Sequence, residues 1–229
     1  MSRIMKHTSQ IVKHALQGVV VLLVGLSGTL HAQISHTSSG LVDKNAERIL
    51  KLAEQKFNTG SVAFSVDMVA LDDAKKETAR HTAKIVYRQG KYKADVGQQS
   101  ILCDGTTIWQ HNKQANEVVV NSVTTGGDDL MNPGQLLKDY EKNFRAKFIR
   151  TDPDGTAVVD LMPKQPKSYH KVRLLINEKS GLLKRLTMHN YDGSEASFAV
   201  SGFRSTKTSD ADFVFDVSQH KGVEVIDMR

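Results

Sequence analysis

Few side chains in this sequence stand at a spacing that catalysis would require. Ser168 and Lys171 match the serine-x-x-lysine spacing of penicillin-recognising enzymes. That chemistry needs the serine at the start of a helix, so that the lysine one turn later can reach it. Here the segment leads into a predicted strand, where alternation points the two side chains apart. The companion motifs of that class are absent as well, so the sequence gives little support to such an enzyme.

The residues that could bind metals or phosphate are also scattered. Zinc sites place their ligands in pairs at short, regular spacings, whereas the five histidines after residue 40 occur singly, at His81, His111, His170, His189 and His220. The run from Asp152 to Gly155 lacks the later glutamate of a calcium loop, which favours a β-turn. Gly126-Gly127 lacks the lysine of a phosphate loop and indicates a flexible connection. We therefore expect no metal, no cofactor and no catalytic residue.

The first 32 residues have the pattern of a cleavable export signal. Arg3, Lys6 and Lys13 form a basic start without acidic residues, an apolar run covers residues 15–26, and Ala32 stands at the expected cut. The run is about half of the roughly 20 apolar residues that a membrane span needs. We predict a signal peptide over residues 1–32, a single domain over residues 33–229 and a periplasmic location.

Composition limits the function further. Removing the three basic residues of the signal leaves 28 basic against 25 acidic residues, a net charge of +3 spread along the chain. This small excess of positive charge does not indicate nucleic acid as a partner. Cys103 is the single cysteine, so no internal disulfide can form, and its place in an apolar strand pattern favours a buried, inert thiol.

The hydrophobic pattern predicts a mainly β domain with a few helices. Asp43 can cap a helix in which Ala46, Ile49, Leu50, Ala53 and Phe57 recur at helical spacing. From residue 61 the period changes to two, with turn residues between short segments. Asn132-Pro133 can begin a second helix. The count is roughly ten to twelve antiparallel strands and two or three helices, and a sheet of that size must curl or close to hide one face.

The order of motifs resembles that of the periplasmic outer-membrane lipoprotein carrier family, LolA. The signal and the first helix are followed by a strand ending Ile85-Val86-Tyr87-Arg88, and then by the block Cys103-Asp104-Gly105-Thr106-Thr107-Ile108-Trp109. Family members carry Asp-Gly-Lys-Thr-Leu-Trp at this place. The Pro133 helix, the strand ending Leu161-Met162-Pro163-Lys164, the hairpin around Gly181 and the tail Phe213-Val214-Phe215 continue the resemblance over the mature chain.

The resemblance implies a fold and a binding site. The fold is α+β and mainly β: an incomplete, half-open antiparallel β-barrel of about 11 strands, with a lid of two or three α-helices over a hydrophobic cavity. The cavity would hold acyl chains, lined by apolar side chains of the strands and of the second helix, namely Phe64, Val66, Met68, Ile85, Tyr87, Ile108, Trp109, Leu136, Leu137, Leu174, Ile176, Met188 and Phe198.

The resemblance also assigns a role to Arg88, at the end of its strand. In the family an arginine at the matching position holds the lid by bonding to backbone carbonyls of the lid in the closed state. The best-known carriers have a proline after this arginine, whereas this chain has Gln89. A solvated arginine at a strand end is the alternative interpretation of Arg88.

Partners follow from the same resemblance. They are acylated lipoproteins, an inner-membrane lipoprotein-releasing ABC transporter and an outer-membrane acceptor, with the carrier acting as a monomer. Two other functions remain open from the sequence: a lipid-binding sensor or accessory protein of the same fold, and a carrier of another acylated envelope lipid. An enzyme acting on lipids would need a nucleophile with a base, and no such pair is visible.

Overall fold

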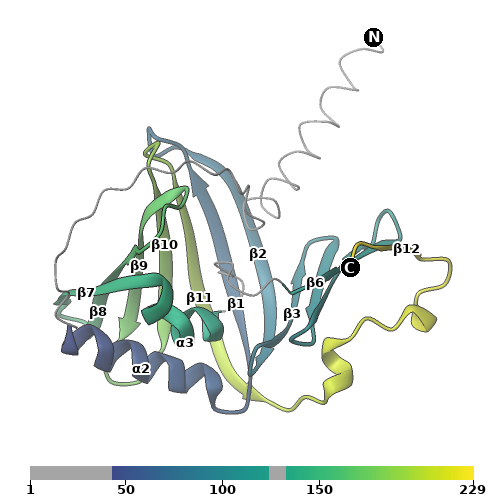
Figure 1. Ribbon diagram of the computed structural model, residues 1–229, viewed down its shortest axis with the longest axis horizontal. Coiled ribbons are helices and arrows are strands. Elements are labelled where there is room, and N and C mark those ends of the chain that lie inside the picture. The colour runs from purple at the N-terminus through teal and green to yellow at the C-terminus, as the bar shows by residue number, and fades with distance from the viewer. Residues whose placement is uncertain (1–42, 124–132) are drawn as a thin grey trace, which may run out of the picture.

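A single twelve-stranded sheet dominates the computed structural model, which describes residues 43–123 and 133–229. The predicted signal peptide, the start of the mature chain near Gln33 and the predicted Gly126-Gly127 loop lie outside the described residues. The sheet is strongly curved, with the long strands β1, β2 and β7–β11 on one side and the shorter β3–β6 on the other (Figure 1).

The elements alternate between long antiparallel runs and two α-helices. The first part of the chain forms α2 (Lys44–Asn58), β1 (Ser61–Leu71), β2 (Glu77–Arg88), β3 (Lys91–Val96), β4 (Gln99–Cys103), β5 (Thr107–Asn112) and β6 (Glu117–Ser122). The second part forms α3 (Pro133–Asn143), β7 (Phe144–Thr151), β8 (Thr156–Pro163), β9 (Tyr169–Asn177), β10 (Leu183–Asn190), β11 (Glu195–Thr206), the short 3₁₀ turns η1 (Asp210–Phe213) and η2 (Val217–Gln219), and β12 (Glu224–Asp227).

The strand order shows that the sheet is open. It runs β12-β6-β5-β4-β3-β2-β1-β11-β10-β9-β8-β7, so β12 and β7 are its two edges. Every pairing is antiparallel except that of β12 with β6, which is parallel. The half-open antiparallel barrel predicted from the sequence is therefore confirmed, with twelve strands in place of about eleven. The parallel strand β12 departs from the predicted meander because the long segment after β11 returns along the sheet before it pairs.

Helix α2 forms where the sequence predicted it, and Asp43 determines where it begins. Asp43 Oδ1 accepts hydrogen bonds from the amides of Asn45 and Ala46, at 3.1 Å each, and so satisfies two donors of the first turn. Its Oδ2 accepts from the Phe148 amide in β7 at 2.8 Å. One carboxylate thus caps the helix and attaches it to the edge of the sheet.

The two helices cover part of the concave face of the sheet. α2 buries Ala46, Ile49, Leu50, Ala53 and Phe57, and α3 packs on both α2 and β7. At the end of α2 the Phe57 ring meets Phe64, Tyr87 and Phe203 edge-on, at centroid distances of 5.7, 6.1 and 5.6 Å. Such aromatic contacts add to the burial of apolar area. This layer of helix and sheet is the main core.

The connections use the turn residues that the sequence indicated. Asp104 Oδ1 accepts from the amides of Thr106 and Thr107, at 2.8 Å each, in the β4–β5 turn. Asp152 accepts from the Gly155 amide at 2.9 Å in a plain β-turn between β7 and β8. These short links hold neighbouring strands in antiparallel register.

Candidate functional site

The concave face of the sheet gathers most of the apolar residues that the sequence assigned to acyl-chain binding. Twelve of the thirteen belong to one apolar cluster or pack against it. Ten of them are buried: Phe64, Val66, Met68, Ile85, Tyr87, Leu136, Leu137, Leu174, Ile176 and Met188. Ile108 and Phe198 are partly exposed at the border of the cluster. Strand alternation places those on the strands on one face, and α3 brings Leu136 and Leu137 against them.

Trp109 is the exception and corrects the expectation drawn from the family block. Side chains alternate along β5, so that Ile108 packs against the concave cluster while Trp109 lies on the opposite, outer face. There Trp109 packs against a second cluster made of Leu102, Val118 and Phe215. It therefore supports the outer layer and does not line the concave face.

Part of the concave face is apolar and still accessible. Several inward residues are only partly buried: Val96, Ile101 and Ile108 on β3–β5, and Ala196, Phe198 and Val200 on β11. Accessible apolar surface next to a covered core is the type of surface on which a hydrocarbon chain can be buried. The enclosed cavity predicted from the sequence remains a prediction.

Arg88 lies on the outer face, away from α2 and α3. Its neighbour Tyr87 points into the concave cluster, so alternation sends Arg88 outward. Arg88 Nη1 donates to the carbonyl oxygen of Thr208 at 2.9 Å, Nη2 donates to Asp210, and the guanidinium carbon lies 5.2 Å from the centre of the Phe213 ring. Among the described residues, its partners all belong to the segment that follows β11.

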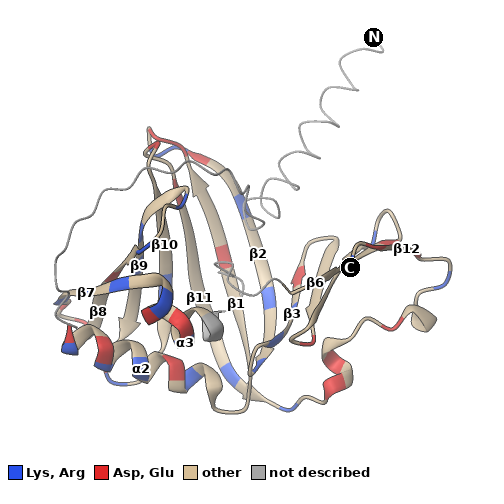
Figure 2. Ribbon diagram, viewed as in Figure 1, with Lys and Arg blue, Asp and Glu red and all other residues tan. Residues whose placement is uncertain are grey.

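This geometry corrects the partner expected for Arg88. The resemblance implied a carbonyl of the helical lid, whereas the carbonyl that Arg88 binds belongs to the chain between β11 and η1. Lys91 Nζ also contacts Asp210, at 2.6 Å. Hydrogen bonding to Lys91 first, and then the charges of Lys91 and Arg88, hold the pKa of Asp210 below its ordinary value. Figure 2 shows the acidic turn η1 beside the basic ends of β2 and β3.

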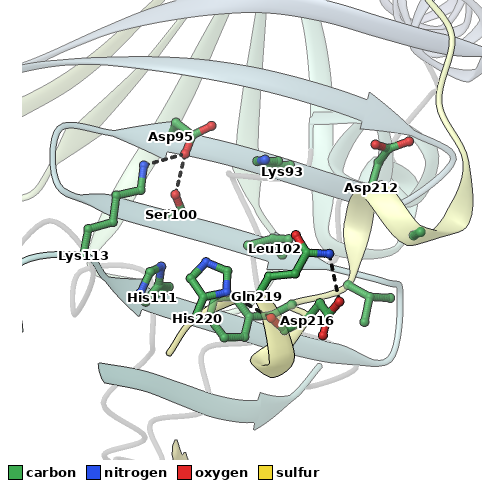
Figure 3. Close-up of a pocket in the computed structure, with 13 residues that line it drawn as sticks. Lys93, Asp95, Ser100, Leu102, His111, Lys113, Asp212, Asp216, Gln219 and His220 are labelled. Atoms are coloured by element: carbon green, nitrogen blue, oxygen red, sulfur yellow. Dashed lines mark hydrogen bonds and ion pairs between the residues drawn. The ribbon is translucent and has the colours of Figure 1, made fainter. Parts of the chain in front are cut away.

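The C-terminal segment forms a second layer over the outer face of β3–β5 and borders a pocket. The pocket has a volume of about 590 Å³ and is bounded by charged, polar and apolar side chains of both layers (Figure 3). Asp95 accepts hydrogen bonds from Ser100 and from Lys113 there, the latter at 3.2 Å. Asp95 and Lys113 thus form an ion pair in this wall.

An aromatic group of two histidines and a phenylalanine closes one side of the pocket. The rings of His111 and His220 lie 4.8 Å apart, and Phe215 stacks on His220 at 4.2 Å. His111 is buried, and its Nε2 has no hydrogen-bond partner in the described part of the chain. Burial first, and then electrostatic repulsion from His220 and Lys113, lower the pKa of His111.

The sequence predicts His111 and His220 to be isolated, because they are far apart in the chain. Only the return of the C-terminal segment brings His220 beside His111, and nothing in the spacing of either residue signals this. Across residues 43–123 and 133–229, no group of three or more histidine, cysteine or acidic residues has a geometry suited to a metal ion. Over the same ranges, no helix is long and apolar enough to span a membrane.

Comparisons with known proteins agree with this architecture. A family model described as outer membrane lipoprotein carrier protein LolA matches residues 88–216. An outer-membrane lipoprotein carrier protein from Histophilus somni (strain 2336) is 26% identical over 175 residues, which cover 72% of this chain and 83% of that protein. A crystal structure of an uncharacterized conserved protein from Thermus thermophilus is similar with a TM-score of 0.54 and 13% identity, over 80% of this chain and 99% of that one.

A further crystal structure, of a LolA superfamily protein from Nitrosomonas europaea, is similar with a TM-score of 0.45 and 14% identity, over 75% of this chain and 98% of that one.

Proposed function

We propose, because this chain belongs to the LolA family of outer membrane lipoprotein carrier proteins, that it carries acylated lipoproteins across the periplasm and shields their acyl chains on its concave face. In this proposal an inner-membrane ABC transporter releases the lipoprotein to the carrier, and an outer-membrane acceptor receives it. The protein acts as a binding protein and not as an enzyme.

The observation that carries the proposal is the partly exposed apolar surface of the concave face. Burying hydrocarbon contributes about 0.8 kcal/mol per methylene group, so acyl chains do not cross water unescorted. The inward residues of β3–β5 and β11, including Ile101, Ile108 and Phe198, offer apolar contacts beside the rigid core. A surface of this kind can accept a hydrocarbon chain without unfolding of the sheet.

A carrier must also release what it binds, and the open sheet supports this. β7 and β12 are not paired with each other, so the concave face has an open side and the two parts of the sheet can differ in stability. α2 and α3 cover β7 and the adjoining core but make their main contacts away from β3–β6. Cargo on β3–β5 could therefore leave without disrupting the helix-covered core.

The first test is to identify what the protein carries. The protein would be purified from its native envelope, and its bound lipids and lipoproteins would be identified by mass spectrometry. The expected result is acylated lipoproteins. Co-purification of an unrelated acyl lipid alone would favour a carrier of that lipid, and the absence of any acylated ligand would count against the proposal.

A matched pair of variants locates the site. Phe198→Glu places a charge on the concave face, and Tyr191→Glu places one on the outside, where Tyr191 is 73% exposed. We expect Phe198→Glu to lower the affinity for a diacylated lipopeptide by at least tenfold and Tyr191→Glu to leave it unchanged, with circular dichroism as the check on folding. Equal affinities in the two variants would place the acyl chains elsewhere.

A further inference from the structure

The concave face changes in chemical character between β3 and β6. On β1–β3 most inward residues are apolar, for example Phe64, Ile85 and Ala94. Polar groups enter there through His81, which pairs with Met68, and through the hydroxyls of Tyr87 and Tyr92. On β4–β6 the inward positions alternate between apolar residues and side-chain amides. The pairing of Ile101 with Gln110 and of Ile108 with Asn121 places the two kinds next to each other.

Three of these amides, Gln99, Gln110 and Asn121, have no hydrogen-bond partner within residues 43–123 and 133–229. All three are half-buried. A fourth amide, Asn112, is already used, because its Oδ1 accepts from the amides of Gln114 and Ala115, at 3.0 and 3.1 Å, in the β5–β6 turn. The three remaining amides are therefore available to a ligand.

The register of the strands arranges these three amides in a line. Gln110 faces Ile101 on β4 and Val119 on β6. Gln99 lies two residues from Ile101, and Asn121 lies two residues from Val119 in the opposite direction along the sheet. Strand spacings of about 4.8 Å and a rise of about 3.4 Å per residue give a diagonal of roughly 16 Å, close to the length of five extended peptide residues.

Cationic side chains are missing from this part of the face. β4, β5 and β6 contain no lysine or arginine. The lysines and arginines of β2 and β3 alternate with buried inward residues and therefore lie on the outer face. They are Arg80, Lys84, Arg88, Lys91 and Lys93. The charged residue at an inward position of β4–β6 is Glu117, which pairs with Asn112. Phosphate groups are recognised mainly by arginine, lysine and helix N-termini, so a carboxylate here disfavours them.

We infer that the amides of Gln99, Gln110 and Asn121 form a subsite for an acylated polypeptide. The subsite binds the uncharged polar linkage between acyl chains and polypeptide, namely the ester and amide carbonyls beside the acyl chains and the first peptide groups. An amide side chain both donates and accepts hydrogen bonds, so it can pair with the carbonyls and with the N–H groups of this linkage. Burying these carbonyls without partners would cost free energy. The subsite thus selects acylated polypeptides over anionic phospholipids with the same chains, and this inference rests on the proposed function.

The test compares three probes on the purified mature protein. They are a synthetic diacylated lipopeptide with an uncharged peptide, dipalmitoylphosphatidylglycerol, and a fluorescent single-chain alkyl probe. The variants Gln110→Met and Asn121→Leu remove amides at nearly constant volume. Gln98→Met, at an exposed turn between β3 and β4, is the matched control.

We expect each amide variant to weaken lipopeptide binding roughly three- to tenfold, the range for a lost hydrogen bond. Binding of the alkyl probe should not change, and Gln98→Met should behave as the wild type. Wild-type protein should bind the phospholipid more weakly than the lipopeptide, and Gln110→Lys should reduce that difference. These results together would support the subsite.

The outcomes separate this inference from the function on which it rests. If the wild type binds lipopeptide and phospholipid equally well, or if the Gln110→Met/Asn121→Leu double variant keeps full lipopeptide affinity, the subsite is wrong while the carrier function stands. If the wild type binds neither the lipopeptide nor the alkyl probe, the proposed function itself fails.

Discussion

Arg88 donates a hydrogen bond from Nη1 to the carbonyl oxygen of Thr208 at 2.9 Å, and so joins the end of β2 to the segment that leaves β11. The arginine side chain is 23% exposed, and its guanidinium also covers the buried ring of Phe213. A single side chain thus provides a polar and an apolar attachment for the C-terminal segment.

Replacing Arg88 with leucine should loosen this attachment. The variant leaves a carbonyl without its charged donor, at a cost of about 1 to 3 kcal/mol. We expect faster hydrogen exchange over residues 208–216, with exchange in α2 unchanged. Lys91→Leu is the control, because the ion pair of Lys91 is with the exposed carboxylate of Asp210, and exposed pairs of this kind contribute little to stability. Faster exchange in α2 and α3 in Arg88→Leu would instead support the latch role that the family implies.

Two glycines of similar backbone conformation allow the packing of α2 to be measured. Gly181, in the β9–β10 turn, and Gly155, in the β7–β8 turn, have φ values of +70° and +76°. A Cβ at Gly181 would lie 2.5 Å from the carbonyl oxygen of Leu52 in α2, whereas a Cβ at Gly155 would meet nothing within 4 Å. The two sites therefore share the backbone strain and differ in the contact with the helix.

Substitution by alanine at each site should separate the two effects. Gly155→Ala should cost about 1 kcal/mol through the left-handed backbone alone. Gly181→Ala should cost a further 1 to 3 kcal/mol or so, because the added methyl group displaces α2. Urea unfolding with an unchanged slope would measure both. Equal losses would mean that α2 moves freely over this turn.

The periodicity of the sequence was sufficient to predict a large antiparallel sheet that must curl or close, since buried and more accessible residues alternate over most of strands such as β3 and β9. That the sheet stays half open was implied by the family resemblance. Periodicity also predicted most of the concave cluster, because inward position follows directly from alternation. The prediction for Trp109 was wrong. This residue was assigned to the cavity because it belongs to a family block, although it follows the inward residue Ile108 by one position and must therefore face outward. Strand alternation could have corrected the assignment.

The outer layer could not be predicted in the same way. The contacts of Arg88 with Thr208 and of His111 with His220 join residues 120 and 109 positions apart. They depend on the path of the segment after β11, which has 3₁₀ turns and no periodic pattern. The three free amides of β4–β6 were likewise ordinary polar residues until the strand register placed them in one line.

The export signal predicts where the mature chain begins. If residues 1–32 are cleaved, N-terminal sequencing of the protein from a periplasmic extract should start near Gln33, with no loss of α2, because its cap Asp43 lies ten residues further on. Ala32→Arg removes the small residue at the cut and should leave a longer, membrane-associated form. Recovery of Met1 in the wild-type protein from a membrane fraction would contradict the prediction.

His111 should make the outer layer sensitive to pH. Burial of its ring lowers the pKa of His111, and electrostatic repulsion from His220 and Lys113 lowers it further. An unfolded histidine has a pKa of about 6.5, so the unfolded state binds the proton more readily. Stability is therefore complete above about pH 6.5 and decreases as the pH falls below that value.

We expect hydrogen exchange over residues 214–223 to accelerate between pH 7.5 and pH 5.5, after correction for intrinsic rates, by more than exchange in β8 or β9. Protonation would place a charge against the ring of His220, 4.8 Å away, with the His111 Nε2 unpaired. His111→Phe keeps an aromatic ring beside Phe215 and should abolish this local difference.

Because the pKa of His189 is also lowered by burial, global unfolding would retain part of its pH dependence, and the local measurement is the decisive one. His170→Phe, on an exposed residue, should behave as the wild type; an unchanged local response in His111→Phe would show that another group controls the layer.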